Sequence, residues 1–148
     1  MLSADDSGHG MDHVNRVCRI ALSISEDSIN KELVFAIALL HDVDDYKLFG
    51  MEYSNNLTNT QMILSKTAFT EEEKKIIIDS IKTIGYSKRI SGITPTINEA
   101  MVVSDADMLD AMGAIGILRS YHYCITHGNP FFDKDAFPIL DLDADKYK

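Results

Sequence analysis

The chain has few of the features that mark secreted, membrane-spanning or disulfide-rich proteins. Its 148 residues include two cysteines, Cys18 and Cys124, which lie far apart and outside any CxxC motif. Neither a zinc knuckle nor a disulfide framework is therefore expected, and both residues are predicted to be reduced thiols. The chain has no apolar run of about 18 residues and no basic segment leading into an apolar signal stretch. The expected location is the cytoplasm, without a membrane partner.

Positive charge is also scarce. Lys and Arg together number 14 against 23 Asp and Glu, so the formal net charge is -9. Because DNA, RNA and anionic membranes are polyanions, this excess argues against any of them as the main partner. It does not exclude a small phosphorylated substrate, because a bound metal ion can invert the local field.

Helical periodicity is the main feature that the chain does have. Apolar residues recur at the 3.6-residue spacing in several segments, and no segment favours a sheet. This pattern predicts an all-α bundle of about five helices that forms one domain over residues 1–148. The expected helices run from about His9 to Ser25, from about Lys31 to Asp42, from about Asn55 to Lys66, from a Thr70 cap to Ile84, and from a Thr96 cap to about Ile125.

Local capping signals support several of these starts. Thr70 with Glu73 is the cleanest capping box, and the patterns at residues 96–99 and 58–61 have the same spacing. Asn30 is a cap candidate for the second helix. The segment at residues 44–54 is predicted to be a loop.

The most apolar helix ends in a cluster of chemistry-bearing residues. Residues 33–40 are all apolar, and His41, Asp42, Asp44 and Asp45 follow. Carboxylates at a helix C-terminus oppose the helix dipole, and crowded carboxylates are costly to bury unless they are paired or bind a metal. His with Asp suits Mn, Fe, Zn or Ni. A solvated turn, in which His41 makes an ordinary hydrogen bond, is the alternative that this stretch alone leaves open.

A second candidate residue lies on the first helix. His13 falls at the edge of the apolar face of that helix. Asp12 and Arg16 stand four residues apart, so a surface ion pair is the simple explanation for both.

A third cluster lies inside the last predicted helix. Asp107 and Asp110 share a stripe with apolar residues, whereas Asp105 points with three methionines. A carboxylate on an apolar face pairs, takes up a proton or binds a cation. Gly113 and Gly116 are expected to permit close helix packing rather than to serve as ligands.

These three clusters, in this order, resemble the signature of the HD-domain metal-dependent phosphohydrolases: a His, then an adjacent His-Asp, then a distant Asp. The resemblance is close to one bacterial subgroup of small predicted hydrolases and covers about residues 8–133. It is carried by residues 8–17 (GHGMDHVNRV), 39–47 (LLHDVDDYK), 86–88 (YSK) and 105–116 (DADMLDAMGAIG).

The resemblance implies that one divalent ion is held by His13, His41, Asp42 and Asp107. Manganese is the first candidate, with Fe, Ni, Co, Zn or Mg as alternatives. Asp107 is preferred as the fourth ligand because Ala-Asp-x-Leu matches the family context, and Asp105 stays open as the alternative. Asp105 or Asp12 would then accept a hydrogen bond from a ligand imidazole.

The resemblance also implies a role for residues around the ion. Asp45 matches the acidic position that related enzymes use for catalysis, and Arg16, Lys47 and Lys88 match basic positions that could hold a phosphate. Asp44 has no assigned role and is expected to be solvated.

The implied reaction is hydrolysis of a phosphoester or phosphoanhydride bond by metal-activated water. The implied substrate is a nucleotide, and the subgroup leans toward nucleotide pyrophosphohydrolysis. The alternative is a catalytically silent, metal-binding regulatory domain. Family members usually continue with a further helical segment, so the C-terminal part is expected to be short or missing, and a homodimer is an open option.

Overall fold

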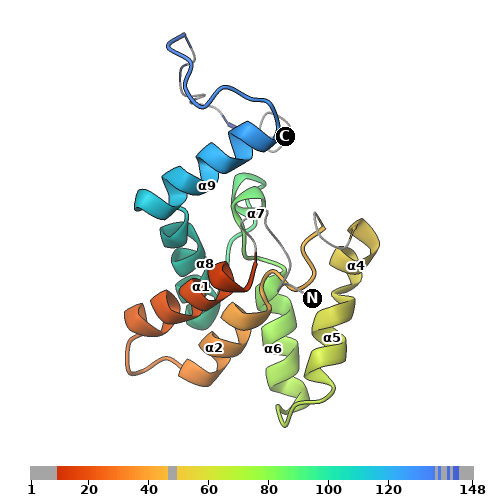
Figure 1. Cartoon of the computed structure of the whole chain (residues 1–148). Coiled ribbons are helices and arrows are strands. Elements are labelled where there is room, and N and C mark those ends of the chain that lie inside the picture. The colour runs from red at the N-terminus through yellow and green to blue at the C-terminus, as the bar shows by residue number, and fades with distance from the viewer. Residues whose placement is uncertain (1–9, 47–49, 136, 138–139, 141, 144–148) are drawn as a thin grey trace.

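The computed structural model describes residues 10–46, 50–135, 137, 140 and 142–143, and within these ranges it consists of helices and no strands (Figure 1). The all-α prediction is confirmed. No described helix is both long enough and apolar enough to cross a membrane. The helices are α1 (Met11–Ile24), α2 (Lys31–Leu40), α4 (Met51–Asn56), α5 (Thr58–Leu64), α6 (Glu71–Ile81), α7 (Tyr86–Ile90), α8 (Asn98–Asp110) and α9 (Gly113–Thr126).

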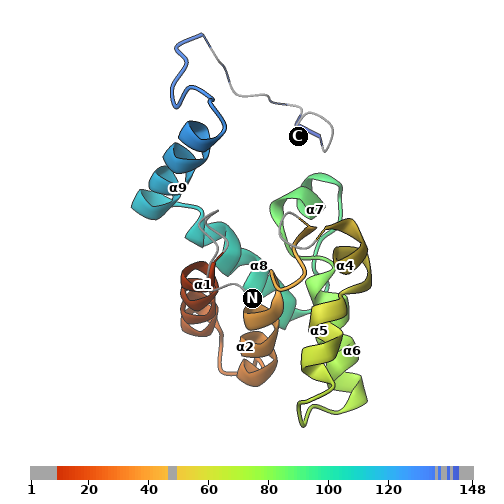
Figure 2. The same cartoon turned by 45° about the vertical axis from the view of Figure 1, so that its right-hand side comes forward.

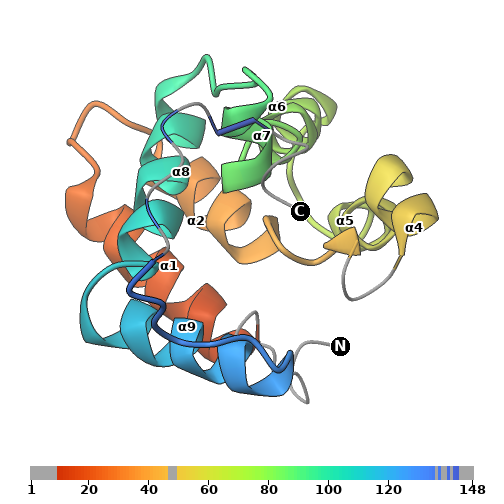
Figure 3. The same ribbon diagram turned by 90° about the horizontal axis from the view of Figure 1, so that it is seen from above.

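The centre of the bundle is formed by α1 and α2, which follow one another, and by α8 from the later part of the chain. α8 packs against both α1 and α2, α6 packs against the other side of α2, and α5 lies outside α6 (Figure 3). Val14, Ile37, Ile77 and Val103 supply fully buried side chains from α1, α2, α6 and α8. Each such side chain stabilises the fold by about 1.5–3 kcal/mol relative to exposure. The apolar character of α2 is explained by its position between α1, α6 and α8.

Two of the predicted helices are each divided in two. The third begins earlier than expected, as α4, and the chain then turns at Leu57, whose φ of 47° lies in the left-handed region, before α5. The prediction of a loop over residues 44–54 was therefore wrong for its last residues, because α4 begins at Met51. A further short helix, α7, follows Gly85, beyond the end at Ile84 that the sequence pattern predicted for the fourth helix.

The expected single helix up to about Ile125 is broken between Asp110 and Gly113. Gly113 has a φ of +68°, a conformation that glycine adopts without steric cost. Gly116 lies against the backbone carbonyl of Ala111, where a Cβ atom would collide. The glycines therefore allow the tight turn between α8 and α9, which a helical periodicity argument alone overlooks.

The cap predictions had mixed outcomes. Thr70 and Glu73 form the predicted capping box at α6, and the Asn30 side chain accepts hydrogen bonds at the start of α2. The predicted boxes at residues 58–61 and 96–99 were wrong, because neither α5 nor α8 has a side-chain hydrogen bond from its N-cap residue. Glu99 instead accepts a hydrogen bond from the backbone N–H of Asn30, at 3.3 Å.

Asp44 corrects the expectation of a solvated acid. It is 3% exposed, and its two carboxylate oxygens accept hydrogen bonds from the backbone N–H groups of Asn59 (2.9 Å) and Thr60 (2.8 Å). These two groups belong to the first turn of α5, where a helix lacks internal acceptors and the dipole favours an anion. Asp44 therefore caps α5 from a distance and ties the segment after α2 to it.

The last described helix packs little against the bundle. α9 has no buried residue and extends beyond the bundle (Figure 2). Both cysteines are free thiols, as predicted: Cys18 is buried in the core and Cys124 is half-buried on α9. Burial raises the pKa of the Cys18 thiol, which keeps it protonated and unreactive.

Candidate metal centre

Two histidines meet where the start of α1 approaches the end of α2. His13 lies in the first turn of α1, next to Val14, whose burial carries this face into the core. His41 directly follows α2. Both side chains are 2% exposed, and their ring centroids are 5.4 Å apart in an edge-to-face arrangement.

Two carboxylates complete the cluster. Asp42 Oδ2 lies 3.4 Å from His13 Nε2 and 3.5 Å from His41 Nε2. Asp107 Oδ1, from α8, lies 3.5 Å from His13 Nε2 and 4.0 Å from His41 Nε2. The carboxylates are 15% and 18% exposed. The cluster is therefore enclosed on the imidazole side and reachable from solvent on the carboxylate side.

Hydrogen bonds at the far side of each ring set the direction of its other nitrogen. His41 Nδ1 lies 2.7 Å from the carbonyl oxygen of Ala38, and His13 Nδ1 lies 2.7 Å from Asp110 Oδ2. Because each partner is an acceptor, Nδ1 carries the proton in both rings. In a neutral ring this leaves the Nε2 lone pair directed at the two carboxylates.

Ligand atoms of His13, His41 and Asp107 lie within 4.8 Å of one another, as binding of one cation requires, and Asp42 lies beside both imidazoles. For metal–ligand distances of about 2.1 Å, tetrahedral donors lie about 3.4 Å apart and neighbouring octahedral donors about 3.0 Å apart. The four distances of 3.4–4.0 Å are close to that spacing. His41 Nε2 is buried and has no hydrogen-bond partner among the described residues. An unsatisfied buried group of this kind costs about 1–3 kcal/mol, and coordination would remove that cost.

The pKa values of Asp107 and His13 are both shifted from their ordinary values in this cluster. Burial raises the pKa of Asp107, and the charge of Asp42 adds to this, whereas His41 and His13 oppose it. Burial by itself would lower the pKa of His13, but hydrogen bonds with Asp42 and Asp110 and the charges of Asp42 and Asp107 outweigh it, so that the pKa is raised. The raised pKa of Asp107 thus follows mainly from its burial, whereas the raised pKa of His13 follows from the neighbouring carboxylates, whose negative charge a cation would also offset.

The structure separates the two candidates for the fourth ligand. Asp107 faces the histidines, whereas Asp105 is exposed on the opposite side of α8. Asp12 is also exposed, so neither Asp105 nor Asp12 has the buried position expected of a partner for a ligand imidazole. The buried acid beside His13 Nδ1 is instead Asp110, at 2.7 Å, which the sequence analysis missed. Its place on the stripe of Asp107 was the signal that could have identified it.

The residues proposed to act on substrate have different surroundings. Asp45 is half-buried, and its backbone N–H donates to the Asp42 carbonyl at 3.1 Å. Arg16 bonds to Asp110 across helices, and this bond raises the pKa of Arg16 more than the charge of Asp12 does. Lys88 is exposed on α7, and Lys47 lies outside the described residues.

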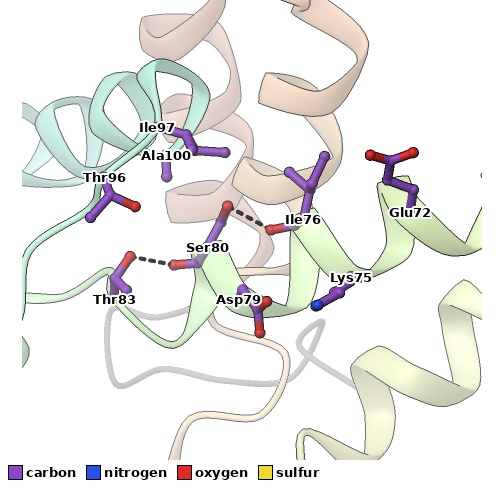
Figure 4. A pocket seen from close by; sticks show the side chains of 9 residues that line it. All are labelled: Glu72, Lys75, Ile76, Asp79, Ser80, Thr83, Thr96, Ile97 and Ala100. Carbon is purple, nitrogen blue, oxygen red and sulfur yellow. Dashed lines mark hydrogen bonds between the residues drawn. The ribbon is translucent and has the colours of Figure 1, made fainter.

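A separate hollow of about 390 Å³ lies between α6 and the start of α8 (Figure 4). The hydroxyl groups of Ser80 and Thr83 on its wall are already used, because each donates to a backbone carbonyl of its own segment. None of the four clustered residues lines it, so it is not the space in which a ligand would meet the cluster.

The four clustered residues lie within a region of the chain that matches a known protein family. The model of the HD domain matches residues 10–112, which include both histidines and both carboxylates. The uncharacterized protein YpgQ of Bacillus subtilis is 30% identical over 135 residues, covering 89% of this chain and 65% of YpgQ. The uncharacterized protein L803 of Acanthamoeba polyphaga mimivirus is 33% identical over 132 residues, covering 79% of this chain and 54% of L803.

Solved structures share the fold of this chain. A crystal structure of a Lactobacillus plantarum protein superposes with a TM-score of 0.79 and 34% identity, covering 99% of this chain and 68% of that protein. The crystal structure of YpgQ in complex with ADP superposes with a TM-score of 0.67 and 29% identity, covering 87% of this chain and 64% of YpgQ. The chain thus spans less than two thirds of YpgQ and about half of L803.

Proposed function

The chain belongs to the HD domain family, and we propose that it is a phosphohydrolase whose divalent ion is held by His13, His41, Asp42 and Asp107. The bond cleaved is a phosphoester or a phosphoanhydride, and the substrate is a nucleotide. Manganese is the proposed ion, because the set of two imidazoles and two carboxylates suits Mn or Fe better than a thiolate-preferring ion.

The observation that carries the proposal is the convergence of donor atoms on one point. His41 Nε2 is buried without a hydrogen-bond partner among the described residues, and its ring is held by Ala38. Oxygen atoms of Asp42 and Asp107 lie within 4.0 Å of it. A cation at that point would satisfy the ring nitrogen and neutralise both carboxylates.

The reaction is assigned to the exposed side of the cluster. A divalent ion, when bound, lowers the pKa of a water molecule and offsets negative charge on a phosphate group. Asp45 is proposed to accept the proton from the attacking water, because it follows the His-Asp pair within one turn and is half-buried there. Lys47 and Lys88 are proposed to bind phosphate oxygens that do not react. Arg16 is proposed to contribute to phosphate binding only through Nη1, because its Nε and Nη2 already bond to Asp110.

The nucleotide assignment has outside support from one relative. YpgQ was crystallised in complex with ADP, and its structure covers 87% of this chain. ADP contains a phosphoanhydride bond, which is the bond class that the proposed chemistry would cleave. The two reduced cysteines fit a cytoplasmic setting, where nucleotides are abundant.

Metal analysis and a substrate panel test the proposal together. The purified protein is analysed for metal by mass spectrometry, titrated with Mn²⁺, and assayed with nucleoside mono-, di- and triphosphates. We expect His41→Ala and Asp42→Ala to lose metal and turnover while keeping their helical circular dichroism. Asp45→Ala should keep the metal and lose roughly 10²–10⁴-fold in rate, the usual contribution of a general base. Asp105→Asn, on the exposed side of α8, is the matched control and should behave as the unaltered protein.

Two results would contradict the proposal. Full turnover by a metal-free variant would show that the ion has no part in the reaction. Metal binding without turnover on any compound of the panel would favour a regulatory domain that has kept the site and not the activity.

A further inference from the structure

A buried carboxylate, that of Asp110, lies on the Nδ1 side of His13 and is not one of the four proposed metal ligands. The side chain of Asp110 is 3% exposed, at the end of α8, one turn after Asp107. It connects three helices, because its partners are His13 and Arg16 from α1 and Arg119 from α9. Such a fully bonded buried carboxylate fixes the groups around it.

The two oxygens of Asp110 have different partners. Oδ2 accepts a hydrogen bond from His13 Nδ1 at 2.7 Å, from Arg16 Nη2 at 3.0 Å and from Arg119 Nη1 at 3.1 Å. Oδ1 accepts from Arg16 Nε at 2.6 Å. The guanidinium group of Arg16 thus donates hydrogen bonds to both oxygens and fixes the plane of the carboxylate. Arg16 therefore fixes the orientation of Oδ2, the carboxylate oxygen that faces His13.

We propose that Asp110 is a positioning residue: it holds His13 in the Nδ1–H tautomer and directs Nε2 at the ion, while Arg16 and Arg119 hold Asp110 in place. This inference rests on the proposed metal site. The reason is geometric, because an imidazole can offer Nε2 to a metal only when the proton stays on Nδ1.

The two ligand histidines differ in what holds them, and this difference provides an internal control. His41 Nδ1 bonds to a backbone carbonyl, that of Ala38, which no side-chain substitution removes. His13 Nδ1 bonds to a side chain, that of Asp110. Loss of Asp110 should therefore change the tautomer of His13 and leave that of His41 unchanged.

Arg119 extends the network beyond the matched domain. The HD domain match ends at residue 112, whereas Arg119 lies in the middle of α9. Its bond to Asp110 joins α9 to the metal centre. Because Arg16 still grips both oxygens of Asp110 without it, Arg119 is expected to contribute less than Arg16 does.

The first measurement is made on metal-free protein labelled with ¹⁵N at histidine. Ring ¹⁵N–¹H correlation spectra are recorded at alkaline pH, well above the ordinary histidine pKa of about 6.5, and assigned with the His13→Gln and His41→Gln variants. In the unaltered protein we expect both rings as Nδ1–H tautomers. In Asp110→Ala we expect His13 to show mixed tautomers, while His41 keeps its spectrum.

The second measurement is Mn²⁺ affinity by titration calorimetry. Asp110→Ala should bind Mn²⁺ about 10–100-fold more weakly, the usual effect of removing the partner of a ligand histidine. Asp110→Asn keeps an acceptor oxygen facing His13 and should retain the tautomer and most of the affinity. Arg119→Gln should change the affinity by only a few-fold. Asp105→Asn, an exposed acid on the same helix, should change neither property.

The outcomes separate this inference from the proposed function. If the unaltered protein binds no divalent ion, the proposed function fails, whereas the tautomer spectra still test the role of Asp110. If the protein binds Mn²⁺ and Asp110→Ala keeps both the affinity and the His13 tautomer, the inference is overturned. Should Asp110→Ala not fold, Asp110→Asn decides: a folded Asn variant in which His13 loses its Nδ1–H tautomer would also overturn it.

Discussion

α8 and α9 follow one another in the chain, and α9 is the more apolar of the two, yet only α8 is packed into the bundle. α8 buries Val103 and Ala106 between α1 and α2, whereas Leu118 of α9 is 62% exposed. Apolar content therefore does not by itself place a helix in a core, because burial requires partner helices with matching faces.

The connection between the two helices has a different physical character from the bundle contacts. α1, α2 and α8 pack through apolar side chains, in addition to the bonds of Asp110 to α1, whereas the side-chain bond between α8 and α9 among the described residues is the Arg119–Asp110 ion pair. An ion pair depends on two specific residues, whereas a packed apolar face is formed by many side chains. The Arg119–Asp110 pair thus connects α9 to the carboxylate that bonds to His13, while the exposed apolar surface of α9 contributes little to the stability of the described fold.

The largest expected effect contrasts a core residue with an exposed one. Ile37→Ala removes a fully buried side chain at the centre of α2 and should lower the free energy of unfolding by about 2–5 kcal/mol. Leu118→Ala on α9 should change it by less than about 0.5 kcal/mol, the usual range for surface substitutions. Urea denaturation of both variants measures the difference. Equal losses would show that α9 is packed as firmly as α2.

A buried polar anchor of the bundle should have an intermediate effect. Asp44→Ala leaves the backbone N–H groups of Asn59 and Thr60 without their acceptor in a buried position. The expected loss is about 2 kcal/mol, because buried donors keep their full desolvation cost. Asp105→Ala, which removes an exposed acid, serves as the control and should be close to neutral in the same urea titration. A neutral Asp44→Ala variant would mean that water replaces the carboxylate at α5.

The smallest expected effect concerns a helix cap. Thr70→Ala removes the side-chain acceptor at the start of α6 and should cost about 1 kcal/mol, measured as a decrease in Tm of about 2–4 °C. α9 has no side-chain hydrogen bond from its N-cap residue, Met112, so Met112→Ala should leave Tm unchanged. A Thr70→Ala variant with an unaltered Tm would show that the backbone of α6 is held by packing alone.

The same cap predicts a pH dependence with a definite sign. Hydrogen bonds from the backbone N–H and hydroxyl of Thr70 lower the pKa of Glu73 in the folded protein. A carboxyl with a lowered folded pKa stabilises the fold above its unfolded pKa, about 4.3, and this contribution is lost as the pH falls through the folded pKa. Unfolding curves between neutral pH and about pH 3 should therefore show a smaller acid-induced loss in Thr70→Ala than in the unaltered protein.

Much of the fold could be predicted because it depends on local rules. The period of Val14, Val17 and Ala21 predicted α1, and the Thr70–Glu73 spacing predicted the start of α6. The division at Leu57 and the break before Gly113 could not, since a left-handed residue in an otherwise helical pattern leaves the apolar period nearly unchanged. The fold class was therefore correct, while the number of helices was too low.

For the site, the sequence by itself predicted a set of metal ligands from the family motifs, namely His13, His41, Asp42 and Asp107, and the structure places these four side chains close together. It could not assign the neighbouring acids. Only the tertiary structure decided that Asp44 caps α5 and that Asp110 supports His13. The physical reason is that the role of a carboxylate depends on which donors of other helices it meets, and those contacts arise from packing between segments far apart in the chain.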